Sequence, residues 1–305
     1  MNAEGPSAQL CADVADALRL PHPGLVEKDF HVVRALAALQ RVDAEGARLV
    51  FGGGTSLCRA YRLIERMSED IDLRIVATAP LSDGGRRRFR KAVTEALLSA
   101  GFTFDPDNRD HLAVHDGGRT FVYNLPYPRA SASVASLRPI VKVEISSWPL
   151  QCAPAPCAVS TFVSQARERP AELPEILCVD VAETAADKFV ALTRRIAEEQ
   201  VAEGSRDASL LRHIYDLHRI TPVIDLKLVQ PVLQSIMESD RKTRGARLSA
   251  YSEDPRAVSR NALRLLAEDE AYAAAFAEFQ RDMVYGVKAS LADCLPVLDQ
   301  YAELM

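Results

Sequence analysis

The sequence predicts a mixed α/β domain followed by a helical domain, and two observations support this. Up to about residue 150, apolar residues occur in turn at helical spacing and at a period of two, whereas beyond about residue 180 nearly every segment has helical spacing. Between these regions lie Pro154, Pro156, Pro170 and Pro174, which are typical of a connecting segment. We therefore expect domains at residues 1–175 and 176–305.

The first part is expected to alternate helices and strands. Strands are expected at residues 47–53, 68–77, 119–127 and 138–147, with one short strand in the connecting segment at 151–180. Helices are expected at 23–42, 55–67 and 85–101, the last ended by Gly101. This order predicts a mixed sheet.

The second part is expected to be a helical bundle. Helical spacing covers residues 179–200, 209–220, 228–239, 257–268, 271–284 and 289–304. Pro231 and Pro296 fall within these segments and predict kinks or helix boundaries there.

Composition limits the class of protein. The 305 residues are 48% hydrophobic, which is enough for one large core or two smaller ones. No run approaches the roughly 18 to 20 apolar residues that span a bilayer, and the N-terminus lacks a signal pattern, so we expect a cytoplasmic protein without a membrane segment. Six scattered cysteines predict buried thiols, because the Cys152 and Cys157 pair lacks the second pair that a zinc site needs.

Charge is distributed unevenly. The net charge of -5 excludes a generally basic nucleic-acid coat, but residues 86–91 (RRRFRK) and 241–247 (RKTRGAR) are basic patches. Each patch alone is expected to be a solvated surface. If both flank the candidate site, RNA becomes a plausible partner.

Two aspartates separated by one residue suggest a metal site. In the expected strand IDLRIV, alternation places Asp70 and Asp72 on the face opposite the apolar residues. In RPIVKVEISS, Lys142 and Glu144 share the polar face of another strand. Three carboxylates on neighbouring strands could hold the two cations of an in-line nucleotidyl transfer, with Glu144 helping to deprotonate the acceptor hydroxyl. The alternative is an ordinary polar strand face.

A glycine-rich turn precedes the aspartates. Gly52, Gly53 and Gly54 follow a strand and precede a helix, so their amides, with the hydroxyls of Thr55 and Ser56, could face a triphosphate. The pattern fits neither GxxxxGK[ST] nor GxGxxG, which argues against a P-loop and a dinucleotide site. A tight strand-to-helix turn is the alternative.

Basic side chains could complete a phosphate site. Arg59 and Arg62 lie on the expected helix before the aspartates, although surface ion pairs are the commoner role for such residues. Lys188 and Arg195 lie on nearly one face of a later helix, where the lysine could neutralise charge on a leaving group. An exposed amphipathic helix explains the second pair equally well.

The segment RHIYDLHRI contains one acidic residue. Asp216 is expected either to orient a lysine or arginine of the site or to pair within its own helix with Arg212 or Arg219. His213 and His218 do not share a helical face, which argues against a metal pair there.

The whole pattern resembles the AbiEii/AbiGii, or MenT, group of nucleotidyltransferase toxins, within the DNA polymerase β-like nucleotidyltransferase superfamily. The matching stretches are VEKDFHVVRAL, FGGGTSLCRAYRLIERMSEDIDLRI, IVKVEIS, ADKFVALTRR and RHIYDLHRI. The resemblance implies a polymerase β-like core with a mixed sheet, a C-terminal helical domain, and a nucleotide in the cleft between them. It implies roles for Ser56, Asp70, Asp72, Lys188 and Asp216. Gly52 stands where the family commonly has a lysine.

The resemblance also implies an activity. Similar family members transfer a nucleoside monophosphate from an NTP, in some cases to the 3' end of tRNA, which blocks aminoacylation and growth, and a cognate antitoxin restrains them. Magnesium or manganese is the expected cofactor. The alternatives are transfer to a protein or small molecule, a kinase-like phosphotransferase, and a catalytically silent nucleotide- or RNA-binding module.

Overall fold

The computed structural model describes residues 5–131, 137–201, 207–244 and 249–305. The chain divides into two compact units: unit 1 comprises residues 1–62 and 67–179, and unit 2 comprises residues 63–66 and 180–305. The short segment Leu63–Arg66 therefore belongs to the second unit, although both of its flanks belong to the first. None of the described helices is long and apolar enough to cross a membrane.

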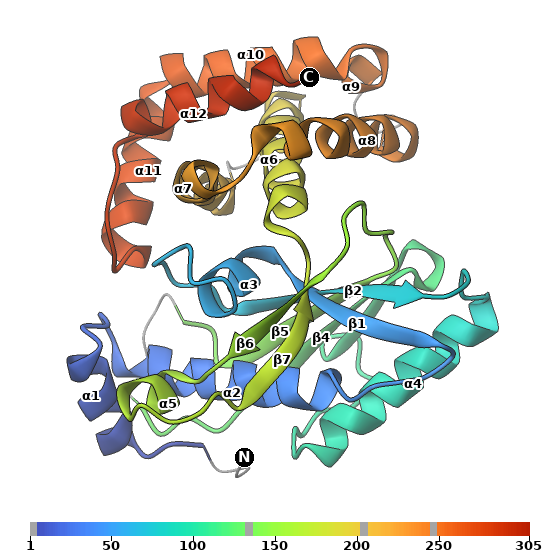
Figure 1. Ribbon diagram of the computed structural model, residues 1–305, viewed down its shortest axis with the longest axis vertical. Coiled ribbons are helices and arrows are strands. Elements are labelled where there is room, and N and C mark those ends of the chain that lie inside the picture. The colour runs from blue at the N-terminus through green and yellow to red at the C-terminus, as the bar shows by residue number, and fades with distance from the viewer. Residues whose placement is uncertain (1–4, 132–136, 202–206, 245–248) are drawn as a thin grey trace. The chain divides into compact units, whose positions relative to one another are not determined.

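Unit 1 is built on a sheet whose described strands follow the order β3-β4-β5-β2-β1-β7-β6 (Figure 1). The strands are β1 (Ala47–Gly52), β2 (Asp70–Ala77), β3 (Leu112–His115), β4 (Thr120–Pro126), β5 (Ile140–Ser146), β6 (Ala155–Val159) and β7 (Leu173–Cys178). β1 pairs with β2 antiparallel and with β7 parallel, and β2 pairs with β5 parallel. The predicted mixed sheet is confirmed.

Helices cover the apolar face of this sheet. The described helices of unit 1 are α1 (Ala8–Ala17), α2 (Pro23–Leu39), α3 (Gly53–Arg59), α4 (Asp83–Ser99), α5 (Phe162–Ala166) and the short 3₁₀ turn η1 (Asp116–Gly118). Apolar residues of α2 and α4 form one core with Ile71, Leu73 and Ile75 of β2. Because side chains alternate along a strand, Asp70 and Asp72 lie on the other face.

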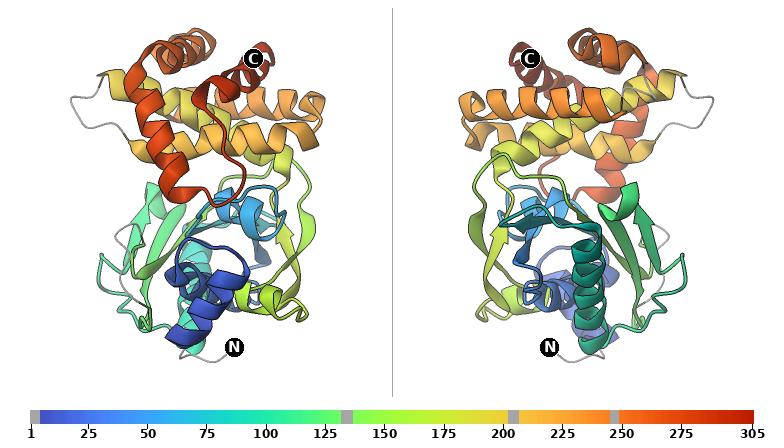
Figure 2. Two further views of the ribbon diagram at one scale, coloured as in Figure 1. Left: turned by 90° about the vertical axis from the view of Figure 1, so that its left-hand side faces the viewer. Right: turned by 90° about the vertical axis from the view of Figure 1, so that its right-hand side faces the viewer.

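The regular elements described in unit 2 are helices, apart from the isolated β-bridge between Arg66 and Val284 (Figure 2). Its elements are α6 (Val181–Val201), η2 (Ala208–Leu210), α7 (Leu211–Ile220), η3 (Thr221–Val223), α8 (Leu226–Arg244), α9 (Ser249–Glu253), α10 (Pro255–Glu268), α11 (Glu270–Met283) and α12 (Leu291–Glu303). The predicted helical part is confirmed. Pro231 and Pro296 lie inside α8 and α12, so neither proline is a helix boundary.

Several elements differ from the expectation. The helix expected at residues 55–67 ends at Arg59, and Arg62 adopts a positive φ of 56°. The connecting segment holds two strands and a short helix instead of one strand, and α1 and β3 were not expected. Four cysteines are buried, whereas Cys152 and Cys157 are half-buried, and all six are free thiols.

Candidate active site

The two predicted carboxylate strands are neighbours in the sheet. The parallel register of β2 and β5 pairs Asp70 with Lys142 and Asp72 with Glu144. Antiparallel pairing with β1 places Gly52 opposite Asp72 on the other side. The glycine turn, the aspartates and Glu144 therefore meet on three adjacent strands of unit 1. We call Asp70, Asp72 and Glu144 the carboxylate face.

Asp72 lies directly against the glycine turn. Gly53 has a φ of +70°, and a Cβ added to it would overlap Oδ2 of Asp72. No side chain fits that space, and L-residues rarely adopt that conformation. Val179, the residue directly after β7, also restricts the side chain at position 52, because a Cβ on Gly52 would lie 2.9 Å from Val179 Cγ2. These contacts explain why the turn is glycine-rich.

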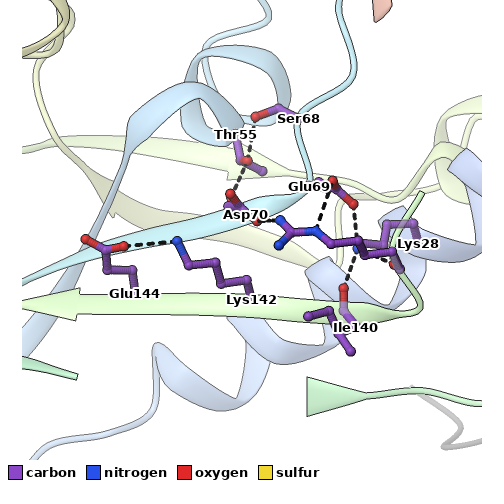
Figure 3. Close-up of polar contacts among 9 residues, drawn as sticks. Lys28, Thr55, Ser68, Glu69, Asp70, Ile140, Lys142 and Glu144 are labelled. Atoms are coloured by element: carbon purple, nitrogen blue, oxygen red, sulfur yellow. Dashed lines mark hydrogen bonds and ion pairs between the residues drawn. The ribbon is translucent and has the colours of Figure 1, made fainter. Parts of the chain in front are cut away.

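The two hydroxyl residues after the glycines are buried. Thr55 Oγ1 donates a hydrogen bond to the Asp70 carbonyl and lies 2.9 Å from Ser68 Oγ (Figure 3). Ser56 Oγ donates to the Gly53 carbonyl at 2.9 Å, and its side chain is 0% exposed. The Thr55 hydroxyl therefore holds the turn against the start of β2, whereas the Ser56 hydroxyl bonds within the turn. Gly53 and Gly54 remain partly exposed.

Basic side chains accompany the carboxylates. Lys142 Nζ lies 3.2 Å from Glu144 Oε2, and the guanidinium of Arg138 lies 3.3 Å from Asp70 Oδ1 (Figure 3 shows the first contact). Across the part of the chain that the structure describes, no three His, Cys, Asp or Glu side chains converge as a ready metal site. The donors nevertheless suit a hard cation, because carboxylate oxygens on adjacent strands are typical ligands of Mg²⁺.

A buried lysine supports the start of β2. Lys28 of α2 contacts Glu69 at 2.8 Å and donates to the carbonyls of Arg138 and Ile140 (Figure 3). Burial lowers the pKa of Lys28, and the charge of Glu69 opposes that shift. These bonds connect α2 to both strands of the carboxylate face. The sequence gives this lysine no distinct signal beyond its place in the stretch VEKDFHVVRAL.

In unit 2, one carboxylate holds two cations. Asp216 accepts two hydrogen bonds from Arg66, from Nε to Oδ1 and from Nη2 to Oδ2, each at 2.6 Å. Lys188 Nζ lies 2.6 Å from Oδ2 of the same aspartate. The side chains of Arg66, Asp216 and Lys188 are 1%, 0% and 7% exposed. We call these three residues the Asp216 cluster.

Electrostatics keep Asp216 ionised. Burial alone would raise the pKa of Asp216, but the charges and hydrogen bonds of Arg66 and Lys188 hold it well below its ordinary value. Burial and the charge of Lys188 lower the pKa of the neighbouring His213, which favours its neutral form. Asp216 therefore pairs with a lysine and an arginine from other elements, not with Arg212 or Arg219 of its own helix.

Arg66 is a member of the cluster that sequence reasoning missed. Helical spacing predicts it at the end of a helix, yet it lies beyond that helix and forms an antiparallel bridge with Val284. The available signal is Asp216 itself. An aspartate flanked by the apolar residues Ile214 and Leu217 on an amphipathic helix is buried with them, and it then needs a cation from another element.

Two arginines predicted to contact nucleotide are engaged elsewhere. Arg59 is buried, lies 2.7 Å from Asp29 Oδ1, and stacks 3.8 Å from the ring centre of Phe162. Arg195 pairs with Asp207. The guanidinium of Arg59 is thus packed and ion-paired inside unit 1, which argues against contact with a phosphate.

A family model covers most of the chain. The model described as "Nucleotidyl transferase AbiEii toxin, Type IV TA system" matches residues 34–303. The chain belongs to the AbiEii nucleotidyltransferase toxin family. The family resemblance seen in the sequence motifs is thereby confirmed, and family membership implies an NTP substrate and an antitoxin partner.

A solved structure supports the mixed α/β fold. The chain is similar to MenT4, a nucleotidyltransferase toxin from Mycobacterium tuberculosis H37Rv, with 19% identity and a TM-score of 0.51, over 94% of this chain and 98% of that one. It also matches an antigenic nucleotidyltransferase-like protein from Paracoccidioides brasiliensis, with 16% identity and a TM-score of 0.35, over 71% and 90% of the two chains. No curated protein matches.

Proposed function

We propose that this AbiEii protein transfers a nucleoside monophosphate from an NTP to RNA, with the 3' end of tRNA as the acceptor, and thereby blocks translation and growth. The observation that supports this most directly is the register of β2 and β5, which sets Asp72 beside Glu144 and against the Gly53 turn. Nucleotidyl transfer needs carboxylates next to a phosphate-binding turn. We propose tRNA as the acceptor because the sequence motifs resemble those of family members that act on tRNA.

The carboxylate face would hold the metal. Asp70 and Asp72 would hold Mg²⁺ or Mn²⁺ on the nucleotide side, and Glu144 would share a second ion. The bound ions would neutralise phosphate charge and activate the attacking hydroxyl. Glu144 is partly exposed, so its carboxylate is accessible to accept the proton of an acceptor hydroxyl, while Lys142 orients it.

The triphosphate would be held by backbone and lysine. The partly exposed amides of Gly53 and Gly54 would contact phosphate oxygens, with Thr55 and Ser56 fixing the shape of the turn. Lys188 would neutralise the charge of the leaving pyrophosphate, and Asp216 would position Lys188. Arg59 is left out of this site because its buried guanidinium pairs with Asp29 and packs on Phe162. Arg195 stays a candidate phosphate contact, because its ion pair with Asp207 is partly exposed and such pairs are weak.

Basic surface residues give limited support for an RNA acceptor. The patch at residues 86–91 lies on α4, where Arg86, Arg88 and Lys91 pair with acidic side chains. Part of the second patch, residues 245–247, lies outside the described residues. The proposed reaction would take place in the cytoplasm, because both tRNA and NTP are found there, and an antitoxin would restrain the enzyme in the same compartment.

Transfer of labelled phosphate tests the proposal. Wild type, Asp72→Ala and Glu175→Ala would each be incubated with total tRNA, Mg²⁺ and each α-labelled NTP, with γ-labelled NTP in parallel. Glu175 is an exposed acid on β7 and serves as the matched control. We expect α-label in tRNA with wild type and Glu175→Ala only. Label from the γ-position would indicate kinase chemistry, and transfer by folded Asp72→Ala would contradict the proposal.

A further inference from the structure

We propose that Arg66 is the permanent counterion of Asp216, which allows Lys188 to exchange Asp216 for a phosphate oxygen of the nucleotide. Arg66 is thus a positioning residue for the site proposed above, and the inference rests on the phosphate role of Lys188 in that proposal. The three side chains lie within one unit, so the argument needs only contacts inside unit 2.

Two cations of the Asp216 cluster share one carboxylate. Arg66 and Lys188 both contact Asp216 at 2.6 Å. His213 next to them favours its neutral form and adds no further positive charge. Because Arg66 alone can neutralise the carboxylate, Asp216 keeps a counterion when Lys188 turns to a phosphate oxygen.

The two cations bind Asp216 differently. Arg66 uses two parallel hydrogen bonds, one to each carboxylate oxygen, and this bidentate geometry is rigid. Lys188 contacts Asp216 through one carboxylate oxygen, with an ammonium group on a flexible stem, and it is the more exposed of the two. If one cation follows an incoming phosphate, Lys188 is the one that moves.

The backbone around Arg66 is fixed independently of Asp216. The carbonyl of Glu65 accepts hydrogen bonds from the amides of Tyr285 at 3.0 Å and Gly286 at 3.1 Å. Arg66 and Val284 form an antiparallel bridge, and a Cβ on Gly286 would overlap the side chain of Glu65. The backbone that carries the guanidinium is therefore fixed by main-chain contacts, as a permanent counterion requires.

Without Arg66, the same aspartate would oppose the proposed function. Asp216 would then depend on Lys188, and withdrawing the lysine toward phosphate would leave a buried carboxylate without its strongest partner. Arg66 removes that penalty. The structure thus assigns Arg66 an effect on anion affinity although Asp216, not the ligand, is its contact.

The affinity of the full chain for inorganic tripolyphosphate, measured by titration calorimetry, tests this effect. Arg66→Gln is expected to weaken its binding by about tenfold or more, because Lys188 is then retained by Asp216. Arg66→Lys should give an intermediate loss. The double variant Arg66→Gln/Asp216→Asn should restore binding, since the retaining carboxylate is gone. Arg194→Gln is the matched control, because Arg194 is also buried and ion-paired, on the helix that carries Lys188.

The outcomes separate the two proposals. If the wild type does not bind tripolyphosphate, or if Lys188→Gln binds it as tightly as the wild type, the proposed phosphate site fails. If Lys188→Gln loses binding but Arg66→Gln keeps it, or if the double variant binds as weakly as Arg66→Gln, the role of Arg66 alone is overturned. Should Arg66→Gln fail to fold, Arg66→Lys and the double variant carry the test, with circular dichroism as the check of folding.

Discussion

The carboxylate of Asp72 occupies the space where any residue other than glycine would place its Cβ at position 53. One contact therefore links the glycine turn to the second aspartate of the carboxylate face. The glycine serves two purposes at once, since it supplies both the positive φ and the room for the carboxylate.

Replacement of this glycine tests the link. Gly53→Ala should destabilise the protein by about 2 kcal/mol or more, from left-handed backbone strain and from displacement of Asp72. It should also weaken Mn²⁺ binding measured by electron paramagnetic resonance. Gly84→Ala is the control: Gly84 is exposed in the first turn of α4, and alanine there should be neutral or stabilising by up to about 1 kcal/mol. Equal effects of both changes would contradict the contact.

The Asp216 cluster makes a prediction about stability. Arg66→Met should cost about 3 to 5 kcal/mol of unfolding free energy at pH 7, because it removes the bidentate partner of a buried carboxylate. Lys188→Met should cost clearly less, since Arg66 still satisfies both oxygens. Urea unfolding measures the two values, and a larger loss for Lys188→Met would show that the lysine is the main counterion.

The same cluster predicts a pH dependence. Since the folded-state pKa of Asp216 is lowered, its ionic contribution is complete above the ordinary value of about 4 and is lost as pH falls through the lower folded value. The difference in unfolding free energy between wild type and Arg66→Met should therefore be constant from pH 7 to about pH 5 and shrink in more acidic solution. A difference that grows below about pH 4 would refute this sign.

His31 predicts a second pH effect in unit 1. Its ring is 0% exposed and stacks on Tyr127 at 4.4 Å, and burial, with the charges of Arg34 and Lys28, lowers its pKa to about 3. Below about pH 6.5 the unfolded chain binds a proton that the folded chain does not, so His31 lowers stability by up to about 1.4 kcal/mol per pH unit as pH falls. His31→Phe should flatten that slope in urea titrations between about pH 6.5 and 4, whereas exposed His115→Gln should leave it unchanged.

Substitution of Arg59 distinguishes a structural role of this residue from a role in nucleotide binding. Its guanidinium pairs with Asp29 and donates to the Ser160 carbonyl at 2.6 Å, so Arg59→Met should cost about 3 to 5 kcal/mol. The folded fraction should bind tripolyphosphate with the affinity of wild type. Exposed Arg62→Ala is the control, with an expected change within about 0.5 kcal/mol. Loss of anion binding by folded Arg59→Met would restore the nucleotide-binding prediction.

Local patterns predicted much of this molecule. Alternation in IDLRIV and IVKVEIS assigned the buried and polar faces of β2 and β5 correctly, because one apolar face fixes the period of a strand. Helical spacing located the α-helices described in unit 2 except the short α9. The adjacency of Asp72 and Glu144 follows from a parallel pairing between segments far apart in the chain, which leaves no local signal.

Long-range contacts account for what the sequence did not predict. Residues 60–67 keep helical spacing, yet the chain leaves the helix because Leu63–Arg66 joins unit 2 and Arg66 bridges to Val284. The partner of Asp216 was equally hidden, since 150 residues separate it from Arg66. Similarly, Arg59 carries the pattern of a surface residue, and only its partner Asp29 on another helix explains its burial.

The membership of Leu63–Arg66 in unit 2 has a consequence for truncated forms of the chain. A fragment beginning at Asp180 would contain every described helix of unit 2 but neither the guanidinium that pairs with Asp216 nor the bridge partner of Val284. Such a fragment should melt at a lower temperature than the same helices in the intact chain. A synthetic peptide carrying the missing residues should raise that temperature, so the two units are interlaced in sequence and cannot be exchanged between relatives by a single crossover.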